Sequence, residues 1–261
     1  MEFPILSAQE LYTREEEYEE SIDPTWHSEK WKIDDEYEIS KLSAALGEAQ
    51  GRTVLDCTCG TGNQAIPLAK MGWQVTASDF TDAYLGRARQ RAQLQDLDIR
   101  FQSCDVRLLS GLFHGEFDWV ISCMALDNIT DDDGIRQAIR GMYGALKPVG
   151  KCYIRLRDFD NILQERPRYE FKGDRILPYG RVLMMEDWIY ESETHVLHVD
   201  IYWLEDHRKS GYQWSQEIFA YRRRALHKAE LAAFLREAGF RTVDFLPQPS
   251  PWHPYEVIAS S

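Results

Sequence analysis

A glycine-rich turn carries the spacing that points most directly to chemistry. It is formed by residues 54–62, VLDCTCGTG. Gly60 and Gly62 allow the backbone to turn tightly and to approach a bound ligand. Asp79 follows Gly62 by seventeen residues, and a carboxylate at this spacing can accept hydrogen bonds from both hydroxyls of a ribose. These residues predict a site for a nucleoside-containing ligand; the alternative is a structural glycine turn with unrelated carboxylates.

Two side chains around the turn indicate which kind of nucleoside ligand fits. A dinucleotide site needs a third glycine for close helix packing, and Ala65 occupies that place. Asp56 directly precedes the turn, where its negative charge would repel a pyrophosphate. A nicotinamide-dependent dehydrogenase is therefore disfavoured, and a cationic ligand without phosphate is favoured.

The turn and its acidic partner resemble a known cofactor site. VLDCTCGTGNQAIPLA, together with ASDF at residues 77–80, is similar to the S-adenosylmethionine (SAM) site of class I methyltransferases. The resemblance implies SAM as the cofactor and S-adenosyl-L-homocysteine as the product. It places Asp56 at the methionine end, Asp79 at the ribose and Phe80 beside the adenine. The implied cofactor-binding residues are Asp56, Cys57, Gly60, Gly62, Asp79, Phe80, Asp105, Val106, Cys123, Trp31 and Tyr37.

A second motif points to the methyl acceptor. RDFDNIL at residues 157–163, with the segments that follow, is similar to glycine N-methyltransferases and their glycine/sarcosine relatives over roughly residues 30–259. The resemblance implies that Arg157 clamps a substrate carboxylate with its planar fork, and that Tyr221 and Met124 also contact substrate. The alternative for Arg157 is a structural ion pair with Asp158 or Asp160.

The chain also departs from that family, and one carboxylate has an open role. Ala125 stands where the family has an asparagine, and Ile201 where it has a tyrosine, which points to a larger or less polar substrate. Asp127 and Tyr221 are the candidate catalytic residues, with Asp127 orienting an ammonium group or accepting a proton. The alternative is that Asp127 caps the next helix or lies in a solvated loop.

Histidine and cysteine residues give no predicted metal site. The histidines near the insertion and the last helix are expected at the surface or in packing; they are His195, His198, His207 and His227. Cys57 and Cys59 lack a second ligand pair at zinc spacing, so we assign no metal. The five cysteines fall in or beside apolar runs and are expected to be reduced core residues.

Alternating apolar runs and helical patterns predict the elements that position these residues. Strands are expected at residues 53–57, 74–78, 99–103, 117–122, 151–156, 242–246 and 256–259, with helices at 64–71, 81–95 and 135–146 and an apolar helical stripe over 231–238. Residues 195–204 and 212–221 are expected to form an antiparallel pair. The predicted fold class is α/β: a Rossmann-like, mostly parallel seven-stranded sheet with helices on both faces, plus an antiparallel hairpin insertion and an N-terminal arm.

The chain is expected to form one methyltransferase domain in four parts. These are an arm or lid at residues 1–40, a cofactor-binding core at 41–156, a substrate-side insertion at 157–222, and a C-terminal helix and strands at 223–261. The arm holds three basic and thirteen acidic residues, interleaved with aromatic ones. In the resembling enzymes this arm covers the cofactor and can reach a neighbouring subunit, so a homo-oligomer through the arm is expected; the alternative is hydrophobic anchoring.

Composition limits the function classes. The 261 residues carry a net charge of −13 and are 44% hydrophobic, which excludes a mostly disordered chain. Nucleic acid is disfavoured as a partner because it binds basic surfaces, and residues 222–224 (RRR) are expected in a solvated or ion-paired loop. No spanning segment or leader is visible, so no membrane partner is expected and the cytoplasm is the expected location.

The predicted function is SAM-dependent methylation of a small molecule, on the nitrogen of an amino acid or related amine. Ala125 and Ile201 keep open an O- or C-methyltransferase that acts on an aromatic natural product. A non-catalytic, SAM-binding partner subunit is the alternative of another class.

Overall fold

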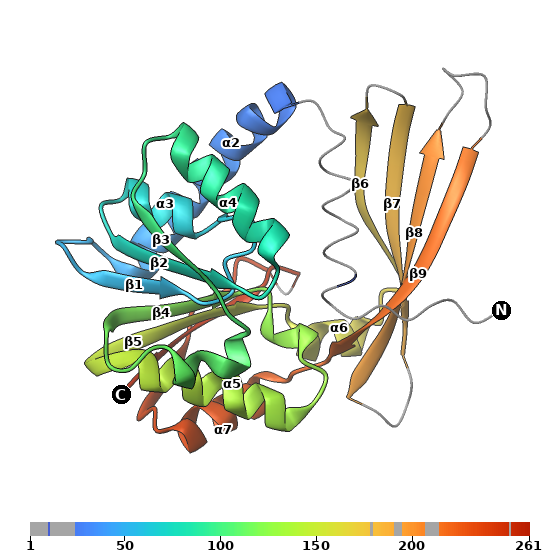
Figure 1. Ribbon diagram of the computed structural model, residues 1–261. Coiled ribbons are helices and arrows are strands. Elements are labelled where there is room, and N and C mark those ends of the chain that lie inside the picture. The colour runs from blue at the N-terminus through green and yellow to red at the C-terminus, as the bar shows by residue number, and fades with distance from the viewer. Residues whose placement is uncertain (1–9, 11–23, 178–179, 191–194, 207–213, 251) are drawn as a thin grey trace.

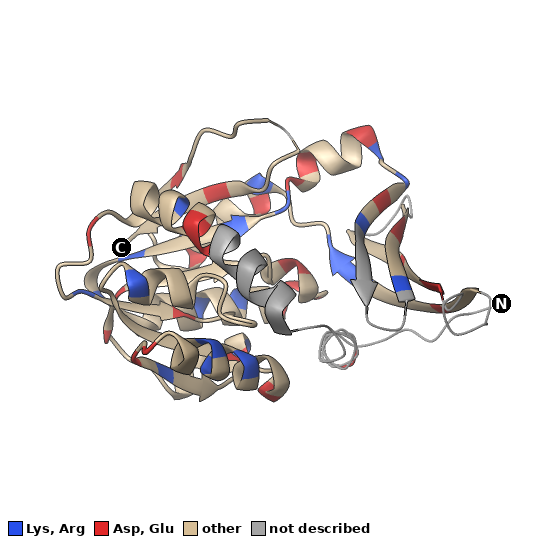
Figure 2. Cartoon of the chain, turned by 90° about the horizontal axis from the view of Figure 1, so that it is seen from above, with Lys and Arg blue, Asp and Glu red and all other residues tan. Residues whose placement is uncertain are grey.

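The structure is a computed structural model that describes residue 10 and residues 24–177, 180–190, 195–206, 214–250 and 252–261. Two sheets dominate it: a seven-stranded sheet and a smaller four-stranded sheet that stands beside it. Figure 2 shows the same separation from above. No helix in the described ranges combines the length and apolarity needed to cross a bilayer.

The large sheet confirms the predicted fold class. Its strand order is β10-β11-β5-β4-β1-β2-β3, and β1 to β5 run parallel, whereas β11 runs antiparallel to both neighbours. The strands are β1 (Thr53–Asp56), β2 (Gln74–Asp79), β3 (Ile99–Ser103), β4 (Phe117–Cys123), β5 (Leu146–Leu156), β10 (Thr242–Phe245) and β11 (Tyr255–Ser260). Central strands such as β1 are nearly continuous buried runs because helices cover both faces.

Two hydrophobic clusters hold the helices on opposite faces of this sheet. One face packs α2 (Pro24–Leu46), α3 (Ala65–Lys70) and α4 (Asp82–Leu94) against strand residues such as Val54 and Tyr153. The other packs α5 (Asp132–Ala145), α7 (Lys228–Ala238) and the short 3-10 helix η1 (Val106–Gly111) against Leu55 and Val120. Gly239 ends α7 in the left-handed conformation that glycine favours.

The insertion is larger than the predicted hairpin. The expected pair is present as β8 (Val196–Asp206) and β9 (Trp214–Arg224), and two further strands, β6 (Tyr169–Leu177) and β7 (Gly180–Ile189), extend it to a four-stranded antiparallel sheet. Strands β6 and β7 carry charged residues among their apolar ones, which hides strand periodicity. The predicted hairpin is therefore wrong in extent, because the insertion forms a four-stranded sheet.

Several predicted boundaries also shift. The expected arm ends at residue 40, which lies inside α2, and the expected insertion ends at residue 222, which lies inside β9. Residues 147–150, between the expected helix at 135–146 and the expected strand at 151–156, belong to β5 at a register shift against β4. Helix α6 (Phe159–Glu165) was not predicted; it follows Asp158, whose side chain accepts a hydrogen bond from the Asn161 backbone.

Candidate functional site

A cavity of about 710 Å³ opens where the loops after β1, β2, β3 and β4 meet, at the carboxyl ends of the parallel strands. This edge is where open α/β sheets bind ligands. The predicted residues on its wall are Cys57, Gly60, Asp79, Phe80, Asp105, Val106, Cys123, Met124 and Tyr221. The structure thus brings these predicted residues together around one cavity.

The glycine turn is shaped by its backbone. Gly60 and Gly62 have φ angles of +50° and +87°, which strain residues that carry a Cβ. A Cβ at Gly62 would lie 3.1 Å from Ile66 Cγ1 and 3.3 Å from the Cβ of Ala88. Gly62 therefore permits close packing behind the turn, whereas Gly60 lies on the cavity wall.

Asp79 ties the turn to the end of β2. Its Oδ2 accepts a hydrogen bond from the Gly60 backbone N–H at 2.9 Å, and its Oδ1 accepts one from the Thr81 backbone N–H at 2.9 Å. Burial raises the pKa of this carboxyl, while the bonds from Thr81 and Gly60 partly oppose the rise. Each carboxylate oxygen keeps a further acceptor site, so Asp79 can still receive hydroxyl groups from the cavity.

Asp56 lies behind the turn and does not line the main cavity, so its contact with a methionine end stays a prediction. Its side chain is fully buried, and burial raises its pKa to about 8, with the nearby Asp79 and Glu38 adding to the rise. An acid with this pKa is mostly protonated at neutral pH. Asp56 therefore supports the turn as a neutral group and does not supply the negative charge that the sequence suggested.

The expected adenine side of the cavity carries one unpredicted cation. Phe80, Asp105 and Val106 line it as expected, and Arg107 lies beside them. Arg107 Nη2 lies 2.6 Å from Asp105 Oδ2. Partial burial raises the pKa of the Asp105 carboxyl, but hydrogen bonds donated by Arg107 outweigh this effect and lower the pKa overall. Other wall residues that the sequence did not single out are Thr58, Cys59, Thr61, Asn63, Gln64, Tyr84 and Cys104.

Met124 separates the main cavity from a second one of about 220 Å³. It has a φ of +57°, and its backbone N–H donates to the Arg155 carbonyl at 2.8 Å. The second cavity is also lined by Tyr37, which is 53% exposed and does not line the main cavity. Tyr37 therefore reaches the far side of Met124. Trp31 lies in α2, in a stretch whose side chains are outside the described residues.

A buried ion-pair network holds the predicted substrate residues. Arg157 Nη1 donates to Asp127 Oδ2 at 2.7 Å, and Arg223 Nη1 donates to the same oxygen at 3.1 Å. Arg223 Nη2 reaches Glu186 Oε1 at 3.5 Å, and the Tyr221 hydroxyl donates to that oxygen at 2.9 Å. The network joins the large sheet, through residues 127 and 157, to the small sheet through β7 and β9.

This network defines the surroundings of Arg157, Asp127 and Tyr221. Arg157 pairs with Asp127, not with Asp158 or Asp160, and neither Arg157 nor Asp127 lines the main cavity. Asp127 is fully buried, which excludes both the solvated loop and a helix cap; Asp131 caps α5 instead. The Tyr221 hydroxyl points into the network, and burial raises its pKa well above the usual value.

The three arginines expected in a loop lie in strand β9 and have separate environments. Arg223 belongs to the buried network, and Arg224 pairs with Asp132 and Glu230. Arg222 is exposed and lines the main cavity, and among the described residues it has no hydrogen bond or ion pair. Besides Arg107, it is a second cavity cation that sequence reasoning missed, because a run of like charges is typical of a solvated surface.

Comparisons with known proteins agree with this geometry. Residues 54–150 match the model of a methyltransferase domain family. The chain is 30% identical over 161 residues, 60% of its length, to a glycine/sarcosine N-methyltransferase from Parasynechococcus marenigrum (strain WH8102). A relative from Geobacillus sp. (strain WCH70) is 32% identical over 113 residues, 43% of this chain. These matches span only 57% and 45% of the relatives' own lengths.

Solved structures share the fold over most of the chain. An S-adenosylmethionine-dependent methyltransferase from Clostridium acetobutylicum ATCC 824 has a TM-score of 0.66 at 16% identity, covering 88% of this chain and 91% of its own. SAM-bound CalS10, an amino pentose methyltransferase from Micromonospora echinaspora, has a TM-score of 0.69 at 17% identity, with the same coverage. Residues 54–150 therefore match a methyltransferase domain, and the chain shares the fold of S-adenosylmethionine-dependent methyltransferases.

Proposed function

We propose that this chain binds SAM in the main cavity and transfers its methyl group to the nitrogen of a small amino acid or related amine. The observation that carries the proposal is the tether between Asp79 and Gly60, which fixes a carboxylate and a glycine turn on the wall of one cavity. The cavity volume of about 710 Å³ lies within the range of ligand sites. These residues fit a nucleoside cofactor without phosphate.

The residues around the main cavity have distinct roles toward the proposed cofactor. Asp79 accepts the ribose hydroxyls, the Gly60 turn allows close backbone approach, and Phe80 and Val106 enclose the base. Cys123 and Met124 form the floor toward the second cavity. When bound, SAM supplies an electrophilic methyl group on a sulfonium.

The acceptor side depends on two guanidinium groups. Arg157 is the clamp implied by the family resemblance, and to bind a substrate carboxylate it must share its fork with Asp127. Arg222 already faces the cavity and is the second group available to an anionic substrate. Asp127 positions Arg157 and Arg223, because both guanidiniums bind its Oδ2. An acceptor amine that is already neutral needs no strong base, so the site's task is to orient it and exclude water.

One observation favours a second candidate. Ala125 lines the cavity, where its small apolar side chain leaves room for a ring, so an aromatic O- or C-acceptor remains the alternative. Ile201 does not contribute to this choice, because it is buried in the core of the small sheet.

The test has a binding step and a turnover step. Calorimetry should detect SAM binding to the whole chain, and Asp79→Ala should weaken it at least tenfold because charge-assisted bonds to the ribose are lost. Asp98→Ala, which changes a carboxylate away from the cavity, is the control and should bind as the wild type does. An unchanged affinity of Asp79→Ala for SAM would refute the assignment of Asp79 as the residue that binds the ribose hydroxyls.

Incubation with methyl-labelled SAM and pooled amino acids, amines and phenols then identifies the acceptor. Label on an amine supports the proposal, and label on a phenol supports the second candidate. SAM binding without any label transfer would instead favour the non-catalytic partner subunit.

A further inference from the structure

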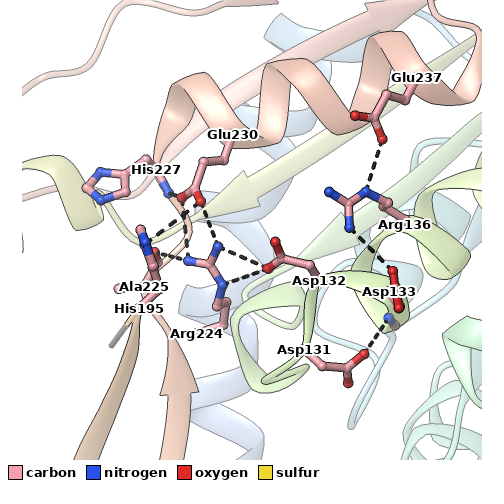
Figure 3. Close-up of polar contacts among 11 residues, drawn as sticks. Asp131, Asp132, Asp133, Arg136, His195, Arg224, Ala225, His227, Glu230 and Glu237 are labelled. Atoms are coloured by element: carbon pink, nitrogen blue, oxygen red, sulfur yellow. Dashed lines mark hydrogen bonds and ion pairs between the residues drawn. The ribbon is translucent and has the colours of Figure 1, made fainter. Parts of the chain in front are cut away.

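We propose that His195, His227 and Glu230 form a binding site for a divalent transition-metal ion of the zinc type. The three residues meet where the small sheet joins the C-terminal helix. His195 directly precedes β8, His227 is the residue before α7, and Glu230 lies in the first turn of α7. Figure 3 shows their side chains close together beside Arg224. None of the three lines either cavity, so the inference is independent of the proposed methyl transfer.

The ligand atoms are already close to a metal-binding arrangement. One nitrogen or oxygen from each residue lies within 4.8 Å of the other two, and His195 Nδ1 lies 3.9 Å from Glu230 Oε1. Zinc bonds of about 2.0–2.1 Å in tetrahedral geometry place ligand atoms roughly 3.3 Å apart. The remaining gap is small, and the side chain of His195 is 61% exposed, so it can rotate to close the gap.

Asp160 supplies the outer support that metal-binding histidines usually have. Its Oδ1 lies 2.5 Å from His227 Nδ1, which holds the imidazole from one side and leaves Nε2 for a metal. Two nitrogens and one carboxylate oxygen form a typical zinc set, with the fourth position open to water. Magnesium and calcium prefer oxygen ligands, so this set discriminates against them.

Glu230 is held as a charged ligand. Its Oε2 accepts from the His227 backbone N–H at 3.0 Å, and its Oε1 accepts from Arg224 Nη2 at 2.7 Å. A carboxylate has about four acceptor positions, so both oxygens retain room for a metal bond.

The surrounding charge favours a divalent cation in spite of Arg224. Asp132, Asp160 and Glu230 carry three negative charges near one guanidinium, which leaves a surplus of two when both imidazoles are neutral. Arg224 lies between Glu230 and Asp132, and Figure 3 shows the two histidines on the side of Arg224 that faces away from Asp132. The Lys228 ammonium is directed to Asp158 at 2.7 Å. A bound ion would neutralise the cluster and link β8 to α7.

The test measures metal binding directly on the untagged whole chain. Titration calorimetry with ZnCl₂ should give one site per chain, and Co²⁺ should give the visible absorption of a low-symmetry site, whereas Mg²⁺ should give neither. His195→Ala and His227→Asn should each weaken Zn²⁺ binding at least tenfold; asparagine keeps a side chain that can cap α7. His114→Ala, which removes an exposed histidine of the loop before β4, is the matched control and should bind as the wild type does.

Thermal melting gives a second readout that separates binding from folding. Zn²⁺ should raise the Tm of the wild type and of His114→Ala, and should leave the Tm of His195→Ala unchanged, because only the bound folded state is stabilised. Absence of Zn²⁺ binding to the wild type, or equal binding in His195→Ala and His227→Asn, would overturn the proposal.

Discussion

The buried carboxylate of Asp127 provides the sharpest test of how the two sheets are joined. Its side chain is 0% exposed, and its Oδ2 receives hydrogen bonds from Arg157 at 2.7 Å and Arg223 at 3.1 Å. Replacing it by alanine leaves both guanidiniums in place and removes the carboxylate that binds them together. Glu186 then remains as the carboxylate nearest to Arg223, and it already accepts from Tyr221 and Trp188.

The expected loss follows from the burial of the groups that remain. Removing one partner of a buried ion pair costs about 3–5 kcal/mol, because the other charge stays desolvated without compensation. The side chains of Arg157 and Arg223 are 17% and 8% exposed, so water can partly solvate Arg157 but hardly reaches Arg223. We therefore expect Asp127→Ala to lower the free energy of unfolding by about 3 kcal/mol, at the lower end of that range.

Urea denaturation followed by tryptophan fluorescence measures this loss, with Asp133→Ala as the matched control. Asp133 pairs with Arg136 at 3.4 Å but is 98% exposed, so its pair should contribute about 0.5 kcal/mol or less. Asp127→Asn should fall between the two, because the amide oxygen still accepts a hydrogen bond. A loss in Asp127→Ala no greater than in Asp133→Ala would refute the network as the link between the sheets.

Two further predictions concern pH and the acceptor. The folded state keeps Asp56 protonated up to about pH 8, whereas the unfolded acid ionises near pH 3.8. Between these pH values the folded state binds more protons than the unfolded state, so the free energy of unfolding should fall as pH rises. The unfolding equilibrium constant should increase by up to about tenfold per pH unit. Urea denaturation at pH 5 and pH 7 should show a steeper fall for the wild type than for Asp56→Asn, and equal slopes would contradict the raised pKa. Once an acceptor is known, Arg222→Ala and Arg157→Lys should each raise its KM about tenfold with SAM affinity unchanged; a normal KM in both variants would exclude a carboxylate clamp.

The sequence predicted the large sheet because its signals are local. Strands such as β1 and β4 are short apolar runs buried on both faces, and turns or helix caps flank them. Strand β6 lacks this signal, since Tyr169 and Phe171 are exposed at an edge and charged residues alternate with them. Its place depends on pairing with β7, which a single sequence does not display.

The same difference separates the two halves of the site. Gly60 and Asp79 are 19 residues apart and follow neighbouring strands, so a motif could connect them. Asp127 and Arg223 are 96 residues apart; Asp127 follows β4 of the large sheet, and Arg223 lies in β9 of the small sheet. Neither charge pattern nor helical spacing links such residues, and the predicted partners of Arg157 were therefore its sequence neighbours rather than Asp127.

The charge balance of the network bears on which acceptor it suits. Arg157 and Arg223 are balanced by Asp127 and Glu186, and Lys172 Nζ lies 3.0 Å from Glu170 Oε1 and 3.9 Å from Glu186 Oε1. The network is therefore neutral without a substrate. A substrate carboxylate that binds Arg157 must share the guanidinium with Asp127, whereas Arg222 lines the main cavity and has no ion pair among the described residues. Because uncompensated charge is costly at low exposure, the amino acid substrate that we propose depends first on Arg222 for the charge that neutralises its carboxylate.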